Sequence, residues 1–204
     1  MDELYSFDAA FYQAGCGYLC GVDEAGRGPL AGPVFAAAVI LPPDTVLEGI
    51  NDSKKLSEKK RELLFERITE AAIAYHIAYA TEAEIDEYNI LQATFLAMHR
   101  AVKGLCIIPD YLLIDGNRRP AFKFEGECVI KGDGKSACIA AASILAKVAR
   151  DRYLCMLDEQ YPQYCFAKHK GYPTVLHYEM LTKYGISPVH RKSFLKKLGT
   201  GVKT

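Results

Sequence analysis

Four acidic side chains stand where apolar runs of the sequence end or where a helix is about to begin. Asp23 and Glu24 follow the run YLCGV, Asp115 ends the run YLLID, and Asp133 precedes a long apolar segment. If the two runs are parallel neighbouring strands, their ends lie about 4.8 Å apart, and two carboxylates at that distance repel by roughly 3 kcal/mol. A proton or a divalent cation relieves this repulsion, and oxygen ligands without His or Cys favour Mg²⁺ or Mn²⁺.

Each of these acids also has a simpler explanation. Asp115-Gly-Asn is a common turn sequence, and Asp133 suits the positive end of a helix dipole. Asp23 and Glu24 can mark the point where a strand meets solvent. Neighbouring residues of a strand face opposite sides, so both acids reach one cation only if the strand ends there, and Gly26 permits such a sharp departure.

The elements expected to position these acids form an α/β fold with a mixed sheet covered by helices. Three consecutive strands that can pair antiparallel are followed by two strands separated from them by helices. Short apolar runs predict strands over 18–22, 33–41, 111–115 and 127–131, and apolar residues at alternate positions predict a strand over 71–80. Capping residues and helical periodicity predict helices over 57–68, 89–103, 136–159 and 173–184, the third of them buried on all sides at its start.

Length and composition fit one intracellular globular domain. Half of the 204 residues are hydrophobic, yet no apolar run of about 18 residues could span a membrane, and the acidic N-terminus does not resemble a secretion signal. The seven cysteines, an odd number, suggest buried free thiols in a reducing cytoplasm. The net charge is zero, but the segment from Lys168 onward has eight basic residues and one acid, which indicates an anionic partner or a solvated basic tail.

Seven motifs in order carry a resemblance to a known family. They are GVDEAGRGPLAGPV, NDSKKLS, LLIDGN, KGDGKS, AAASILAKVARDR, HKGY and HRKSF, between about residues 17 and 195. Together they strongly resemble bacterial ribonuclease HII, the type 2 ribonuclease H. The resemblance implies a ribonuclease H-like five-stranded mixed sheet flanked by helices, with a C-terminal helical extension. We expect a catalytic domain over 1–160 and a basic helical region over 161–204 within the same compact unit.

The resemblance also implies an activity and its residues. The expected enzyme hydrolyses RNA in RNA–DNA hybrids and cuts on the 5′ side of single ribonucleotides embedded in duplex DNA, leaving 3′-hydroxyl and 5′-phosphate ends. Two Mg²⁺ or Mn²⁺ ions would act on the scissile phosphate. The catalytic and metal-binding residues implied are Asp23, Glu24, Asp115 and Asp133, and the substrate-binding residues implied are Gly26, Arg27, Gly28 and Tyr172.

In this family the Gly-Arg-Gly loop and the tyrosine of HKGY sense the ribose 2′-hydroxyl, which is what distinguishes RNA from DNA. Glycine at positions 26 and 28 lets the main chain approach that sugar. The related family ribonuclease HIII lacks this loop. Two rival functions are a noncatalytic nucleic-acid binder, which an acidic pocket disfavours because it repels phosphate, and a nucleotide phosphatase, whose phosphate-binding glycine loop is missing.

The chain is expected to be a monomer in the cytoplasm with no obligatory protein partner, and no motif for a sliding clamp is evident at its C-terminus.

Several other positions have open interpretations. The segment 52–55 either contacts phosphate or caps a helix. Asp151 forms a surface pair with Lys147 or lies close to the metals. The remaining candidates are three histidines, His169, His177 and His190. Phosphate contact or surface placement suits them better than metal ligation.

Overall fold

The computed structural model describes residues 3–51 and 53–196. Its five-stranded sheet has the order β3-β2-β1-β4-β5. Strands β1 to β3 pair antiparallel, whereas β1, β4 and β5 run parallel. This confirms the mixed sheet and all five strands expected from the sequence. The strands are β1 Leu19–Ala25, β2 Val34–Ile40, β3 Ala74–Ala80, β4 Tyr111–Asp115 and β5 Gly126–Val129.

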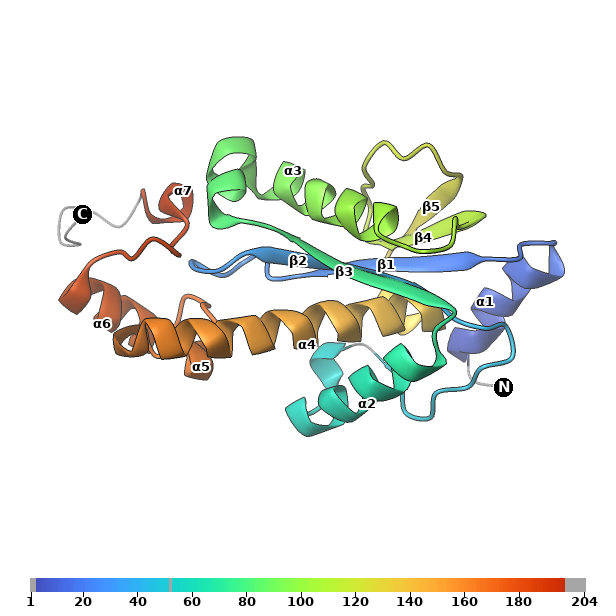
Figure 1. The fold of residues 1–204 in the computed structure, drawn as a ribbon, viewed down its shortest axis with the longest axis horizontal. Coiled ribbons are helices and arrows are strands. Elements are labelled where there is room, and N and C mark those ends of the chain that lie inside the picture. The colour runs from blue at the N-terminus through green and yellow to red at the C-terminus, as the bar shows by residue number, and fades with distance from the viewer. Residues whose placement is uncertain (1–2, 52, 197–204) are drawn as a thin grey trace.

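Helices cover both faces of the sheet (Figure 1). Helix α3 lies on one face, and α2 and α4 lie on the other, so each face has its own hydrophobic core. The shorter C-terminal helices gather at one end of α4. The helices are α1 Glu3–Gln13, α2 Glu58–Ala71, α3 Glu82–Lys103, α4 Ala137–Gln160, α5 Phe166–His169, α6 Val175–Tyr184 and α7 Lys192–Leu195.

Helix α4 lies directly against the first strand. Its first ten residues, 137–146, are all buried, as expected from their uninterrupted apolar character. Ser136 caps its N-terminus by accepting from Ile139 N at 3.2 Å, and Asp8 of α1 accepts from Cys138 N at 2.9 Å. Gly21 makes this close approach possible, because a Cβ there would lie 2.1 Å from the Cys138 carbonyl carbon. The strand that carries the acidic pair is therefore fixed against the longest helix.

The start of α3 differs from the prediction. The helix begins after Thr81, which forms a capping box with Glu84, and not at Asn89. Asn89 interrupts the helix with φ 70°, and its side chain accepts from Leu91 N and Gln92 N. The capping chemistry expected of Asn89 is thus present, but it restarts a helix that has already formed. The three helices α1, α5 and α7 were not predicted.

The C-terminal helices pack on the far end of α4 through a separate apolar cluster that includes Leu154, Tyr164, Phe166 and Leu181. The end of α4 coincides with the expected boundary near residue 160, but a division into two regions stays a prediction. Residues 197–204 of the expected C-terminal region lie outside the described residues. None of the described helices is long and apolar enough to cross a membrane.

The prediction of buried thiols is wrong for most cysteines. Cys20 and Cys138 are buried, whereas Cys106 is exposed and the other four are partly exposed. All seven are free thiols. The apolar neighbours of a cysteine in sequence do not decide its burial where the segment is a loop or a helix end.

Candidate active site

The first strand does not end at the acidic pair, which corrects the expectation that both acids leave a strand end together. Asp23 pairs with Ala37 and Glu24 with Ala36, so β1 continues through Ala25. The pleat turns neighbouring side chains to opposite faces. Asp23 accordingly faces α4, where it contacts Ser143, and Glu24 faces the side of α3.

Both acids are nevertheless close to Asp115. Val22 is paired with Ile114 in the parallel ladder, and Asp23 and Asp115 are the residues that follow them on the two adjacent strands. Because β4 ends at Asp115, the edge of β1 beyond it is open, and Glu24 lines cavities on both sides of the sheet. The condition stated for Asp23 and Asp115, that their strands are parallel neighbours, is met.

Asp133 reaches this edge from a third element. It is buried in the 3₁₀ turn Gly132–Gly134 that precedes α4, and Gly132 N donates to Asp115 Oδ1 at 2.6 Å. The Lys54 ammonium lies 3.9 Å from Asp133 Oδ2. Ser53, next to it, shares a hydrogen bond of 2.8 Å with Ser143 of α4. The segment 53–55 therefore lies at the site, and Asp52 lies outside the described residues.

Burial and like charges perturb two of these carboxyl groups. Burial raises the pKa of Asp23 well above its usual value, and the neighbouring carboxylates of Glu24 and Asp115 raise it further. Burial also raises the pKa of Glu24, although Arg27, 3.4 Å away, opposes the effect. Three negative groups at one sheet edge repel one another, and a cation removes that repulsion.

The four acids do not form a closed ligand shell. Within residues 3–51 and 53–196, no three His, Cys, Asp or Glu side chains lie close enough together to hold a metal ion by themselves. A Mg²⁺ ion in a nuclease commonly takes only one or two carboxylates and completes its shell with water and substrate phosphate. The oxygen-only donors and the crowded negative charge fit such an ion.

The loop after β1 carries two glycines with different requirements. Gly26 has φ +95°, and a Cβ there would lie 2.0 Å from Nε of the buried Arg150. Gly28 is exposed, and a Cβ there would meet only the Tyr172 ring, at 3.9 Å. Gly26 is needed by the fold, whereas Gly28 keeps open the cavity that it lines with Tyr172.

The Tyr172 ring forms part of the wall of the cavity that Gly28 also lines. It is 39% exposed, and Lys147 Nζ and Arg150 Cζ lie 5.9 and 5.8 Å from its centroid. The cations support one side of the ring while it remains accessible. The structure thus brings Gly26, Arg27, Gly28 and Tyr172 together, although Tyr172 is more than 140 residues away in sequence.

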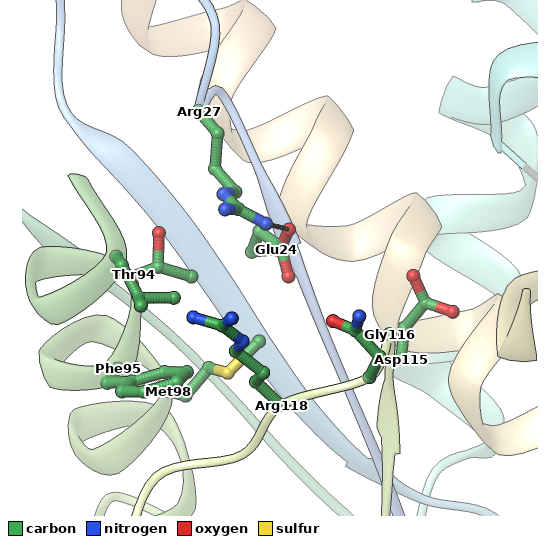
Figure 2. Close-up of a pocket in the computed structure, with 10 residues that line it drawn as sticks. Glu24, Arg27, Thr94, Phe95, Met98, Asp115, Gly116 and Arg118 are labelled. Carbon is green, nitrogen blue, oxygen red and sulfur yellow. Dashed lines mark hydrogen bonds and ion pairs between the residues drawn. The ribbon is translucent and has the colours of Figure 1, made fainter. Parts of the chain in front are cut away.

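A second cavity lies on the α3 side of Glu24 (Figure 2). Figure 2 shows Glu24 between Arg27 and Arg118, with Thr94 and Phe95 of α3 on the wall. Sequence reasoning missed Arg118 and the α3 residues. Arg118 follows Asp115 by three positions, which is a signal that could have identified it.

The interpretation of Asp151 as part of a surface pair is wrong. Its carboxylate does accept from Lys147 Nζ at 2.6 Å, but Asp151 is only 6% exposed and also lies 3.8 Å from Arg61. Burial lowers the pKa of Lys147, and the hydrogen bond with Asp151 opposes the shift. Asp151 therefore orients a cation that lines the cavity next to Tyr172.

The surface placement suggested for three histidines is also wrong, because His169, His177 and His190 are buried in one cluster. The His169 and His177 rings stack at 4.2 Å, and the Nε2 atoms of His177 and His190 lie 3.0 Å apart. His177 Nδ1 donates to the Tyr172 carbonyl, and His169 Nδ1 accepts from Gly171 N. The cluster thus fixes the turn that carries Tyr172.

Acid is expected to weaken the fold through this cluster. Burial lowers the pKa of His177 to about 4, and burial with the nearby His177 lowers the pKa of His190 to about 4. An unfolded histidine takes up its proton near pH 6.5, so stability is complete above that pH and falls as the pH drops toward 4. Between pH 7.5 and 5.5 we expect a loss of about 1 kcal/mol for each histidine.

Urea unfolding at the two pH values measures this loss. The double variant His177→Gln, His190→Gln is less stable, but its stability should depend less on pH over the same range. An equal pH dependence in wild type and variant would contradict the assignment to these two groups.

The order of the sheet and the acids at the edge between β1 and β4 define the class of nucleases with the ribonuclease H fold. A family model described as Ribonuclease HII matches residues 20–197. A Ribonuclease HII from Shewanella halifaxensis is 61% identical over 178 residues, which cover 87% of this chain and 88% of the relative. The chain belongs to the ribonuclease HII family, and it is an endoribonuclease that acts on RNA–DNA hybrids.

Solved structures agree with the fold. The crystal structure of the ribonuclease H2 from Pyrococcus horikoshii OT3 superposes with a TM-score of 0.72 at 28% identity, over 86% of this chain and 93% of that chain. Bst-RNase HIII in complex with Mn²⁺ superposes with a TM-score of 0.68 at 17% identity, over 86% of this chain and 63% of that chain. The second likeness supports the fold alone.

Proposed function

We propose that this enzyme cuts the phosphodiester on the 5′ side of a ribonucleotide, both in RNA–DNA hybrids and at single ribonucleotides embedded in duplex DNA. The products carry 3′-hydroxyl and 5′-phosphate ends. The observation that carries the proposal is the position of Glu24. Glu24 lines both the cavity beside Asp115 and the cavity between Gly28 and Tyr172, so the proposed sites of reaction and of sugar recognition are adjacent.

Asp23, Glu24, Asp115 and Asp133 would hold the divalent ions, Mg²⁺ or Mn²⁺. Such ions lower the pKa of bound water and stabilise charge on the phosphate oxygens. Crowding of carboxylates in a partly buried edge supports this assignment. The hydrogen bond from Gly132 N to Oδ1 holds the Asp115 carboxylate beside the turn that carries Asp133.

The remaining residues bind and orient the duplex. Arg27, whose side chain is 49% exposed, and Lys54, whose side chain is 79% exposed, supply positive charge beside the acids for backbone phosphates. Gly28 leaves space for a ribose beside the main chain, and the Tyr172 ring bounds that space. A 2′-hydroxyl placed there would meet backbone polar groups without interference from a Cβ.

We further propose that the enzyme works in the cytoplasm as a monomer without an obligatory protein partner. An odd number of free thiols, one of them exposed at Cys106, suits a reducing compartment.

A labelled duplex with one ribonucleotide tests the function, incubated without metal and with Mg²⁺ or Mn²⁺, and mapped at nucleotide resolution. We expect a single metal-dependent cut on the 5′ side of the ribonucleotide and none in an all-deoxy duplex. Cleavage 3′ to the ribonucleotide, or cleavage that persists in EDTA, would overturn the proposal. A lack of ATP turnover under the same conditions would dismiss the phosphatase alternative.

A further inference from the structure

Two buried arginines lie behind the Gly-Arg-Gly loop. Arg150 and Arg191 are both 0% exposed, and in the described part of the chain neither forms an ion pair with a carboxylate. Burial lowers the pKa of Arg191 to about 9 and that of Arg150 to about 10, with Glu82 opposing both shifts at longer range. A buried cation is costly unless its donors are satisfied, so the contacts of these groups are informative.

The Arg191 guanidinium binds three main-chain carbonyls. Nη2 donates to Gly26 O at 2.6 Å, Nη1 to Arg27 O at 2.9 Å, and Nε to Gly32 O at 2.8 Å. The C-terminal segment is fastened to the same loop by its backbone, since Arg191 N donates to Leu30 O at 2.8 Å and Gly32 N donates to Val189 O at 2.9 Å. The loop is thus held from behind by one side chain.

Arg150 binds the remainder of the same region. Its donors reach Pro33 O, Ala31 O and Lys170 O at 3.2, 3.1 and 3.0 Å. Lys170 precedes the turn that carries Tyr172. The two arginines therefore join both halves of the expected ribose site, and of the two only Arg191 donates hydrogen bonds to the carbonyls of Gly26 and Arg27.

These contacts decide which polar groups the loop presents. In a trans peptide the C=O and N–H bonds point in opposite directions, and no described peptide is cis. With the Gly26 and Arg27 carbonyls turned inward to Arg191, the N–H groups of Arg27 and Gly28 lie on the opposite side of the loop. Among the described residues neither N–H donates a hydrogen bond.

We propose that Arg191 is a positioning residue for ribose recognition: it holds the Gly26 and Arg27 carbonyls inward and so orients the main-chain groups that meet the sugar. The proposal rests on the proposed function of the loop. Arg191 does not touch substrate. Its planar fork of donors reaches three carbonyls at once, which the single ammonium of a lysine cannot reproduce.

The test compares Arg191→Lys with Arg100→Lys. Arg100 also donates to a main-chain carbonyl, Tyr79 O, and to the Glu84 carboxylate, but none of these hydrogen bonds involves the loop. For Arg191→Lys we expect the cleavage rate at saturating single-ribonucleotide duplex to fall about tenfold to a hundredfold, with affinity for the all-deoxy duplex unchanged. In Arg191→Ala, free guanidinium at non-denaturing concentration should restore part of the rate. Arg100→Lys should retain the wild-type rate.

A wild-type rate in folded Arg191→Lys would overturn the inference, as would equal losses of rate and of all-deoxy affinity. Failure of the wild-type enzyme to cut the ribonucleotide duplex would instead refute the proposed function.

Amide hydrogen exchange on the wild-type enzyme tests the same claim without any variant. The Arg27 and Gly28 amides should exchange rapidly in the free enzyme and become protected by the ribonucleotide duplex in EDTA, but not by the all-deoxy duplex. Protection of both amides in the free enzyme would contradict the inward orientation of the carbonyls.

Discussion

Asp23→Asn is expected to abolish cleavage without weakening the fold. Asp23 lies where β1 meets β4, and burial and the nearby carboxylates of Glu24 and Asp115 disfavour its charge. The neutral amide removes that repulsion, so the free energy of unfolding at pH 7 should stay equal or rise. It would also remove a proposed anionic metal ligand, and a loss of about 4 kcal/mol of transition-state stabilisation would slow cleavage about a thousandfold.

Single-turnover cleavage gives the rate, and urea unfolding of the same preparations gives the free energy of unfolding. Asp44→Asn is the matched control, because Asp44 is an exposed acid in the segment after β2 and away from the site. Its cleavage rate should equal that of wild type. If Asp23→Asn cut within about tenfold of the wild-type rate, the corresponding loss of only about 1.4 kcal/mol would exclude Asp23 as an essential ligand.

Gly28→Ala should impair catalysis while leaving stability unchanged. Gly26→Ala should chiefly lower the stability of the fold. At position 28 the new methyl group meets only Tyr172, at 3.9 Å, inside the cavity where the ribose is expected. Displacement of the sugar by about 1 Å should slow cleavage about a hundredfold. At position 26 the positive φ and the contact with Arg150 should lower the free energy of unfolding by about 2 to 4 kcal/mol.

The pair of variants separates two roles within one motif. Thermal unfolding reports the fold, and cleavage of the single-ribonucleotide duplex reports the site. A stable Gly26→Ala protein would show that the strain argument is wrong. A fully active Gly28→Ala enzyme would show that the sugar does not approach the loop at that residue.

Much of this architecture could be predicted from the sequence, because local periodicity and turn residues agree with the final packing. Short apolar runs and one alternating segment identified five strands, and the apolar start of α4 predicted its burial. Asp23 and Asp115 both end apolar runs, which identified them as candidates, and the structure shows that their strands are parallel neighbours. These features depend on residues near one another in sequence, where physical preferences are strongest.

The errors arose where tertiary contacts decide the outcome. Glu24 remains in the strand because β2 continues to pair with it, and it reaches the acidic edge only because β4 is short. In the sequence the three histidines stand in a basic segment and resemble surface residues, whereas in the structure they pack against one another. Nothing local marks Arg191 as buried, because its partners lie more than 150 residues away. Such contacts are not recorded in any short stretch of sequence.

The most direct measurement of the central claim is anomalous diffraction at the manganese edge from crystals of the enzyme with Mn²⁺ and a duplex carrying a non-cleavable linkage 5′ to one ribonucleotide. The account predicts manganese at the sheet edge, in contact with carboxylates contributed by Asp23, Glu24, Asp115 and Asp133. It also predicts that the ribose lies between Gly28 and Tyr172. Manganese bound elsewhere while this edge stays empty, with duplex in place, would contradict the account.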